Sequence, residues 1–237
     1  MLWIARRQRF RLIICIDPDN DATMIIFSYG LKEHPVMKKL AIDIVILPPD
    51  NVTEVAINYN KLLRGNTEEN IVLGKTRYLP HISLLMGCLA TDQLEEITSI
   101  LHAVVKEHNI LKLAISGIQT DNAGTHGVVS LEIERTQELQ SLHESIANSC
   151  RPFLSQDAEE ADMADPPPIK KSSLEWINRF IPHACFENFW PHITLGLGEY
   201  AGTFEPFDFP ASRVAICHLG NHCTCAEVLG EVSLTLK

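Results

Sequence analysis

The sequence lacks several features that identify common protein classes. No apolar run approaches the roughly 18 to 20 residues that a membrane-spanning helix needs. It contains no glycine-rich phosphate loop, dinucleotide-binding fingerprint or Gly-x-Ser-x-Gly elbow. These absences argue against a membrane protein, a nucleotide triphosphatase, a Rossmann enzyme and a serine hydrolase.

Positive charge is scarce as well. The chain has 20 Lys and Arg against 30 Asp and Glu, which gives a formal net charge of −10. Binding of nucleic acid without sequence preference depends on Lys and Arg that displace counterions from many phosphates. We therefore expect no long nucleic acid tract as a partner, and a nucleic acid ligand that is small or held at one end.

Cysteine usage does not indicate a disulfide scaffold. The seven cysteines are odd in number and scattered through 237 residues, whereas disulfide scaffolds are short and rich in paired cysteines. A reducing cytoplasm fits this usage best. Hydrophobic residues at 46% and charged residues at 21% are typical of a globular protein with a packed core.

The chain divides near Met37. Two lysines follow this methionine and precede the apolar segment 40–47, which is the first clear strand. Residues 1–36 are then an N-terminal extension outside the native fold, or alternatively they hold an ordinary strand at 10–16. Residues 37–237 are expected to form one domain, and we expect a monomer.

Hydrophobic periodicity predicts a mixed order of helices and strands. Short apolar runs predict strands at 40–47, 71–75, 81–86, 111–119, 127–133, 192–197, 212–219 and 227–236. Longer stretches with helical spacing predict helices at 52–64, 92–108, 136–149 and 172–180. For the second of these helices, Thr91 and Asp92 are the predicted cap and first-turn acid.

The stretch 151–171 is acidic and ends in three consecutive prolines. Such a composition offers little apolar area to bury on ordering, so we expect a flexible loop between two halves of the domain. A loop of this length is either a lid over a site or a mere tether.

The most informative feature is an internal repeat. Tyr-Leu-Pro-His-Ile-Ser-Leu at 78–84 returns as Phe-Trp-Pro-His-Ile-Thr-Leu at 189–195, displaced by 111 residues. Each copy resembles the start of a strand, where proline is tolerated. Because residues i and i+2 of a strand share a face, His81 and Ser83 project together in the first copy, and His192 and Thr194 do so in the second.

Two imidazoles and two hydroxyls are the groups that phosphodiester cleavage needs. Imidazole titrates near neutral pH, so one ring can accept a proton while the other donates one. Hydroxyl groups can donate hydrogen bonds to phosphate oxygens. No metal and no cofactor is required, and we expect none.

The paired His-x-Ser and His-x-Thr resemble the two-histidine (2H) phosphoesterase superfamily, which includes RNA 2′,3′-cyclic phosphodiesterases and 2′,5′ RNA ligase-like proteins. The resemblance covers about residues 38–236. It implies an α+β fold with two pseudo-symmetric lobes, each an antiparallel sheet with helices outside, around a central cleft. By similarity His81 would be the acid and His192 the base, with Ser83 and Thr194 holding the phosphate.

Three functions remain open at this stage. The first is hydrolysis of 2′,3′-cyclic phosphates or 2′,5′-linked nucleotides or RNA ends, the second is 2′,5′ joining of RNA ends, and the third is non-catalytic binding of such ligands. The presence of both imidazoles and both hydroxyls favours an enzyme, because a binder needs only donors. In all three cases the partner is a nucleotide or a short RNA end.

Three weaker signals have structural alternatives. A cluster of cysteines and histidines near the C-terminus has ligand types for zinc but no standard spacing, and a Gly-Asn hairpin turn explains it better. Aromatic residues could stack a base or belong to the core. Basic residues could meet a phosphate or lie on a solvated strand face. The cysteine and histidine cluster comprises Cys217, His218, His222, Cys223 and Cys225. The aromatic residues are Tyr78, Trp190, Phe204, Phe207 and Phe209, and the basic residues are Lys75, Arg77 and Arg213.

Overall fold

The structure is a computed structural model that describes residues 38–63, 71–121 and 127–237. All of them belong to one compact unit, 37–237. The predicted N-terminal extension lies outside the described residues. In the described part, no helix is both long and apolar enough to cross a membrane.

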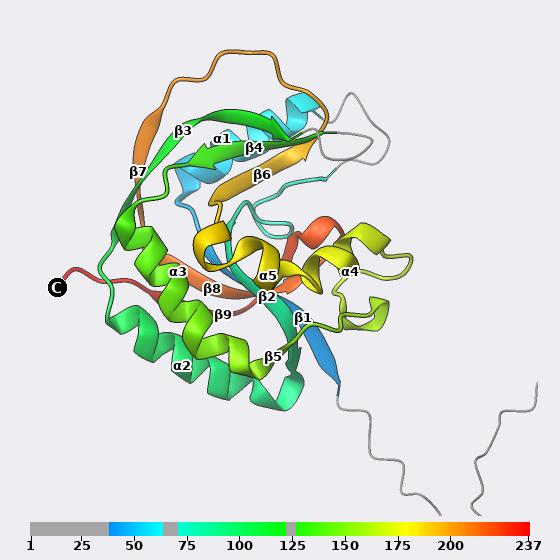
Figure 1. Cartoon of the computed structure of the whole chain (residues 1–237). Helices are drawn as coiled ribbons and strands as arrows, with labels where there is room; N and C mark the ends of the chain where they lie inside the picture. Colours follow the sequence, from blue (N-terminus) through cyan, green and yellow to red (C-terminus); the bar gives the residue numbers. More distant parts are fainter. Residues whose placement is uncertain (1–37, 64–70, 122–126) are drawn as a thin grey trace, which may run out of the picture. The chain divides into compact units, whose positions relative to one another are not determined.

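Two antiparallel sheets organise the domain (Figure 1). Sheet A has the strand order β5-β2-β1-β8-β9 and sheet B the order β6-β4-β3-β7. The strands are β1 (Lys39–Leu47), β2 (Ile82–Ala90), β3 (Leu111–Asp121), β4 (Val128–Ile133), β5 (Leu154–Ser155), β6 (His192–Leu197), β7 (Phe207–Ala211), β8 (Arg213–Leu219) and β9 (Cys225–Ser233). The predicted α+β class with two antiparallel sheets and helices outside them is confirmed.

Helices cover the two sheets separately. The helix α1 packs against β6 of sheet B, whereas α2 and α3 pack against each other and against sheet A (Figure 1). The α-helices are α1 (Asp50–Leu63), α2 (Leu94–Lys106), α3 (Gln137–Cys150), α4 (Lys171–Ile177) and α5 (Phe180–Ala184). Short 3-10 turns are η2 (Thr91–Gln93), η3 (Arg151–Phe153), η4 (Glu160–Asp162), η5 (Phe186–Asn188) and η6 (Asn221–Cys223).

Helix ends follow local chemistry, with one correction. Helix α3 begins where the hydroxyl of Thr136 accepts a hydrogen bond from the backbone N–H of Leu139 at 3.2 Å. The predicted cap of α2 at Thr91 and Asp92 is wrong, because these residues form η2 and the helix begins after it without a side-chain cap.

Strand β1 is apolar along most of its length because both of its faces are buried. Ile42, Ile44 and Ile46 belong to the main core, whereas Val45 and Leu47 belong to a second cluster with residues of β8 and β9. Strand β1 is hydrogen-bonded to β2 on one side and to β8 on the other. It is therefore the central strand of sheet A.

Three predicted elements differ from the structure. No strand forms at 71–75, because the buried amide of Asn60 donates to the carbonyl of Ile71 and accepts from the N–H of Leu73. Strand β7 was not predicted, and it contains Pro210, which is tolerated because β7 is an edge strand. The single helix predicted at 172–180 divides into α4 and α5, since Pro182 lacks the N–H that would bond to the carbonyl of Asn178 in a continuous helix.

The acidic segment 151–171 buries more apolar area than its composition suggests. Ala158, Met163 and Ile169 are at most 7% exposed and belong to the main core. The backbone N–H of Ala164 donates to the carbonyl of Leu219 at 2.8 Å. The expectation that this segment has little apolar area to bury is therefore wrong, whereas its role as lid or tether stays a prediction.

Candidate functional site

The two copies of the sequence repeat lie at the starts of β2 and β6. His81 directly precedes β2, and His192 is the first residue of β6. Strand β6 is the edge of sheet B, and the two-residue β5 alone separates β2 from the edge of sheet A. Strands β2 and β6 contact each other, so the fold brings the two copies together although 111 residues separate them in sequence.

Burial alternates identically in the two copies. Ile82 and Ile193 are 0% exposed, as are the two leucines that follow, whereas the four histidine and hydroxyl residues are partly accessible. Each strand therefore turns one imidazole and one hydroxyl toward one face and buries the apolar residues on the other, as the period of two predicts. The candidate site consists of His81, Ser83, His192 and Thr194.

Both imidazoles are held by the same backbone hydrogen bond. Nδ1 of His81 lies 2.7 Å from the carbonyl oxygen of Leu79, and Nδ1 of His192 lies 2.9 Å from that of Trp190. A carbonyl oxygen only accepts, so Nδ1 of each ring carries the proton and donates. In a neutral ring Nε2 is then an acceptor, which is the state of a base.

Burial makes it harder to protonate either ring. Burial and, to a smaller extent, the charge of His192 lower the pKa of His81 to about 4. Burial also lowers the pKa of His192, where Asp121 opposes the decrease. His192 therefore acts electrostatically on His81, and the opposed placement of the two rings stays a prediction.

A buried carboxyl group adjoins the first histidine. Asp43 of β1 is 0% exposed, and its Oδ2 lies 3.7 Å from Nε2 of His81. Burial raises the pKa of this carboxyl well above its usual range. Asp43 was missed in the sequence analysis, although a single acid inside the apolar run 40–47 was a signal that could have found it.

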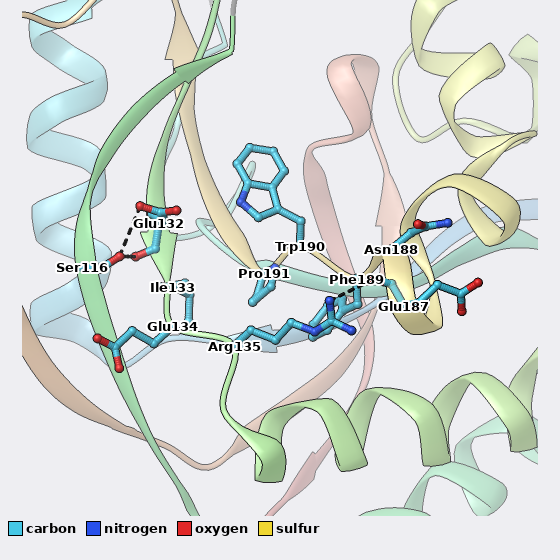
Figure 2. Close-up of a pocket in the computed structure, with 10 residues that line it drawn as sticks. All are labelled: Ser116, Glu132, Ile133, Glu134, Arg135, Glu187, Asn188, Phe189, Trp190 and Pro191. Carbon is cyan, nitrogen blue, oxygen red and sulfur yellow. Dashed lines mark hydrogen bonds between the residues drawn. The ribbon is translucent and has the colours of Figure 1, made fainter.

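A pocket of about 500 Å³ is lined by Trp190 and Pro191, the two residues that precede the second histidine in sequence (Figure 2). Trp190 lines it, is 40% exposed and stacks on the ring of His192 with centroids 4.3 Å apart. The pocket also carries three carboxylates and the guanidinium of Arg135, which donates to the carbonyls of Phe186 and Glu187. Its other residues include Ser116, Glu132, Ile133, Glu134, Glu187, Asn188, Phe189 and Pro191.

The remaining aromatic candidates are less available than Trp190. Phe209 is 1% exposed and belongs to the core. The hydroxyl of Tyr78 donates to Asp165 at 2.7 Å, and Phe204 and Phe207 pack against each other. Among these residues, Trp190 has the exposed ring nearest a site histidine.

The three basic residues proposed for phosphate contact are each paired with a carboxylate. Lys75 binds Glu54 at 2.6 Å, Arg77 binds Asp165, and Arg213 binds Glu231 through two hydrogen bonds. These ion pairs compensate their charge, so the solvated-surface interpretation fits them better.

Two members of the cysteine and histidine cluster near the C-terminus, Cys217 and Cys225, form a disulfide that links β8 to β9. Sequence reasoning did not foresee this pair, because it depends on the β8–β9 register. In the described ranges, no group of three or more histidine, cysteine or acidic residues has the arrangement of a metal site.

Comparison with known proteins places the chain in a family. A sequence model described as the 2′-5′ RNA ligase superfamily matches residues 74–206. No curated protein matches the chain.

Solved structures resemble the fold at low sequence identity. TT0787 of Thermus thermophilus is 16% identical, with a TM-score of 0.55 over 84% of this chain and 100% of that one. E. coli LigT complexed with NADP+ is 13% identical, with a TM-score of 0.51 over 84% and 99% of the two chains. A structure described as a phosphoesterase is 12% identical, with a TM-score of 0.53 over 83% and 98%. These likenesses show a shared two-lobed fold.

Proposed function

Because this chain belongs to the 2′-5′ RNA ligase superfamily, whose membership supports phosphoesterase-type activity, we propose that it opens 2′,3′-cyclic phosphates or 2′,5′-linked nucleotides or RNA ends by metal-independent hydrolysis. In this proposal His81 is the acid, His192 is the base, and Ser83 and Thr194 hold the phosphate. The observation that carries it is the matched setting of the two imidazoles, each fixed through Nδ1 and each with Nε2 left for proton transfer.

The proposed reaction moves one proton at each histidine. Nε2 of His192 accepts a proton from water as the water oxygen attacks phosphorus. The bond from phosphorus to the leaving ribose oxygen breaks, and that oxygen takes the proton of Nε2 of His81. The hydroxyls of Ser83 and Thr194 donate to the non-bridging oxygens, where negative charge grows in the transition state.

The substrate class follows from the relatives and from the charge of the chain. LigT of E. coli has been crystallised with NADP+ and with ATP, which supports a nucleotide as the ligand here. A net charge of −10 favours a small ligand over a long polyanion. A nucleotide or a short RNA end meets both conditions.

The experiment is an assay of the purified protein against 2′,3′-cyclic nucleotides and 2′,5′-linked oligonucleotides, with and without dialysis against EDTA. We expect hydrolysis of at least one substrate and no effect of EDTA. Activity abolished by EDTA and restored by a divalent ion would make the histidines metal ligands. Tight binding without turnover would favour the non-catalytic alternative, and joined RNA products would favour ligation.

A further inference from the structure

Asp43 is a buried acid for which the proposed reaction has no use. Its side chain is 0% exposed, and neither oxygen has a hydrogen-bond partner among the described residues. Leaving a buried polar group unpaired costs about 1 to 3 kcal/mol, so such groups require an explanation. Nε2 of His81 lies 3.7 Å from Oδ2 of Asp43.

The other groups around Asp43 do not supply a positive charge. The hydroxyl of Ser83 and the backbone N–H groups of Leu84 and Leu85 lie on β2, near enough to favour the ionised form and hold back the rise in its pKa. The thiols of Cys185 and Cys223 come from the segments after α5 and within η6, and burial first and the Asp43 charge second raise the pKa of both. His192 acts electrostatically on His81.

Burial has opposite effects on the two members of the Asp43 and His81 pair. It raises the pKa of the acid and lowers that of the imidazole to about 4. With one proton between them the pair has no net charge, whether the proton lies on the carboxyl or on the ring. With none or two the pair carries a buried net charge, which is costly. Burial therefore widens the pH range in which the pair holds one proton.

We propose that Asp43 and His81 share a single proton at neutral pH, that this pair is the acid of the reaction, and that Asp43 is a positioning residue which acts through His81. The inference rests on the proposed function for its catalytic part only. It fixes the direction of proton flow, because His192 has no comparable buried acid among the described residues and stays neutral, as a base must.

The protons taken up and released balance over one turnover. An anionic phosphodiester at Nε2 favours the state with the proton on His81, because the imidazolium attracts both the phosphate and the Asp43 carboxylate. Nε2 gives this proton to the leaving oxygen, which leaves a neutral His81 beside an ionised Asp43. Solvent returns a proton to the pair, and His192 releases to solvent the proton it took from water.

The test is Asp43→Asn, which keeps the shape of the side chain and removes its charge. Without the carboxylate the ring has no partner with which to share a proton, and burial, which lowers the pKa of His81, keeps it unprotonated at pH 7. The alkaline limb of the kcat profile should move to lower pH, and kcat at pH 7 should fall by roughly 10²- to 10⁴-fold, the usual contribution of a positioned acid. An unchanged pH profile would overturn the inference.

The matched control is Asp162→Asn, which removes another buried acid, one that binds Lys39 at 3.8 Å and is 7% exposed. It should lower thermal stability and leave both limbs of the profile in place. A shift of equal size in this control would assign the effect to lost stability and refute the role of Asp43.

A second measurement needs neither activity nor a variant. In the wild-type protein, carbon-13 NMR of the aspartate carboxyls and proton NMR of the imidazoles should give one shared alkaline step for Asp43 and His81. Independent titration, with Asp43 ionising near pH 4, would refute the shared proton. If no substrate is turned over while the shared step is present, the proposed function fails and the proton sharing stands.

Discussion

At the scale of single residues, backbone partners separate a structural histidine from the two site histidines. His143 is 0% exposed, and both of its ring nitrogens are used: Nδ1 lies 3.0 Å from the carbonyl oxygen of Leu84, and Nε2 accepts from the N–H of Phe186 at 2.8 Å. His81 and His192 use Nδ1 alone for the backbone. An imidazole whose Nε2 is not held by the backbone can exchange protons with a ligand, whereas His143 cannot.

We therefore expect His81→Ala and His192→Ala each to lower kcat by roughly 10²- to 10⁴-fold on the substrate that the panel identifies, the usual contribution of a positioned acid or base. The double variant should lose less than the product of the two single losses, because the groups act as a unit. His102→Ala, on the exposed face of α2, is the control and should retain full activity. Wild-type rates in either site variant would remove that histidine from the mechanism.

A second residue-scale prediction concerns acid stability. Burial lowers the pKa of His143 from 6.5 to about 4, so its neutral form stabilises the folded state fully above pH 6.5. That contribution should be lost as the pH falls from 6.5 to about 4, by up to roughly 3 kcal/mol at 1.36 kcal/mol per pKa unit.

Urea unfolding at several pH values checks this. His143→Gln should be less stable than the wild type at pH 7 but should show a shallower decline toward pH 4. The same replacement at the exposed His102 should leave the slope as it is. A slope in His143→Gln equal to that of the wild type would mean that other groups carry the acid sensitivity.

The sequence predicted those functional residues that belong to the duplicated motif and missed those that occur outside any repeat. The duplicated frame singled out His81 and His192 without any structure. Asp43 and His143 occur once each, in an apolar strand and an ordinary helix, and their roles depend on contacts with distant segments. Such contacts leave no periodic signal in the chain.

At the scale of elements, the segment 151–171 is held by contacts that its acidity conceals. Asp165 accepts hydrogen bonds from Arg77 and Tyr78, which precede or begin the first copy of the repeat, and from the N–H of Asn221 in η6. Asp157 forms an ion pair with Lys39 at 2.9 Å. The carboxylates therefore connect the segment to sheet A and to the approach to His81.

Deleting this segment should accordingly destabilise the domain. A gentler test is Met163→Ala, which removes a side chain that is 7% exposed and should cost about 2 to 3 kcal/mol of unfolding free energy. Ala161→Ser, at an exposed position two residues earlier, is the control and should change stability by less than about 0.5 kcal/mol. Equal stability of both variants would mean that the segment contributes little to the fold.

Hydrophobic periodicity predicted most of the helices and strands, because most of them bury one face or both faces. It failed at β7, where a proline interrupts the strand, and at 71–75, where the side chain of Asn60 takes the place of a neighbouring strand. In both cases the deciding fact is the position of the segment in the sheet or beside a helix. That position follows from the tertiary fold and not from the local sequence.

At the scale of the whole molecule, the predicted domain start at Met37 can be tested directly. The compact unit comprises 37–237, and strand β1 begins two residues after its first residue. We expect a chain that begins at Met37 to fold with the same unfolding free energy and kcat as the full chain. Both quantities can be measured side by side, and a loss of more than about 1 kcal/mol would give residues 1–36 a part in the fold.

The strand order also determines how long β1 lacks one of its partner strands during translation. Ile42 of β1 pairs with His218 of β8, so the central strand of sheet A completes its hydrogen bonding with residues that are translated 176 positions later. At about 5 to 20 residues per second, the ribosome needs roughly 10 to 35 s for that interval. During this time the β8-facing edge of β1 has no native partner, and Asp43, later buried, is an ionised group in water. A charge on an unpaired strand edge discourages pairing with other chains, so we expect the same carboxyl that adjoins His81 in the finished protein to disfavour aggregation of the nascent chain.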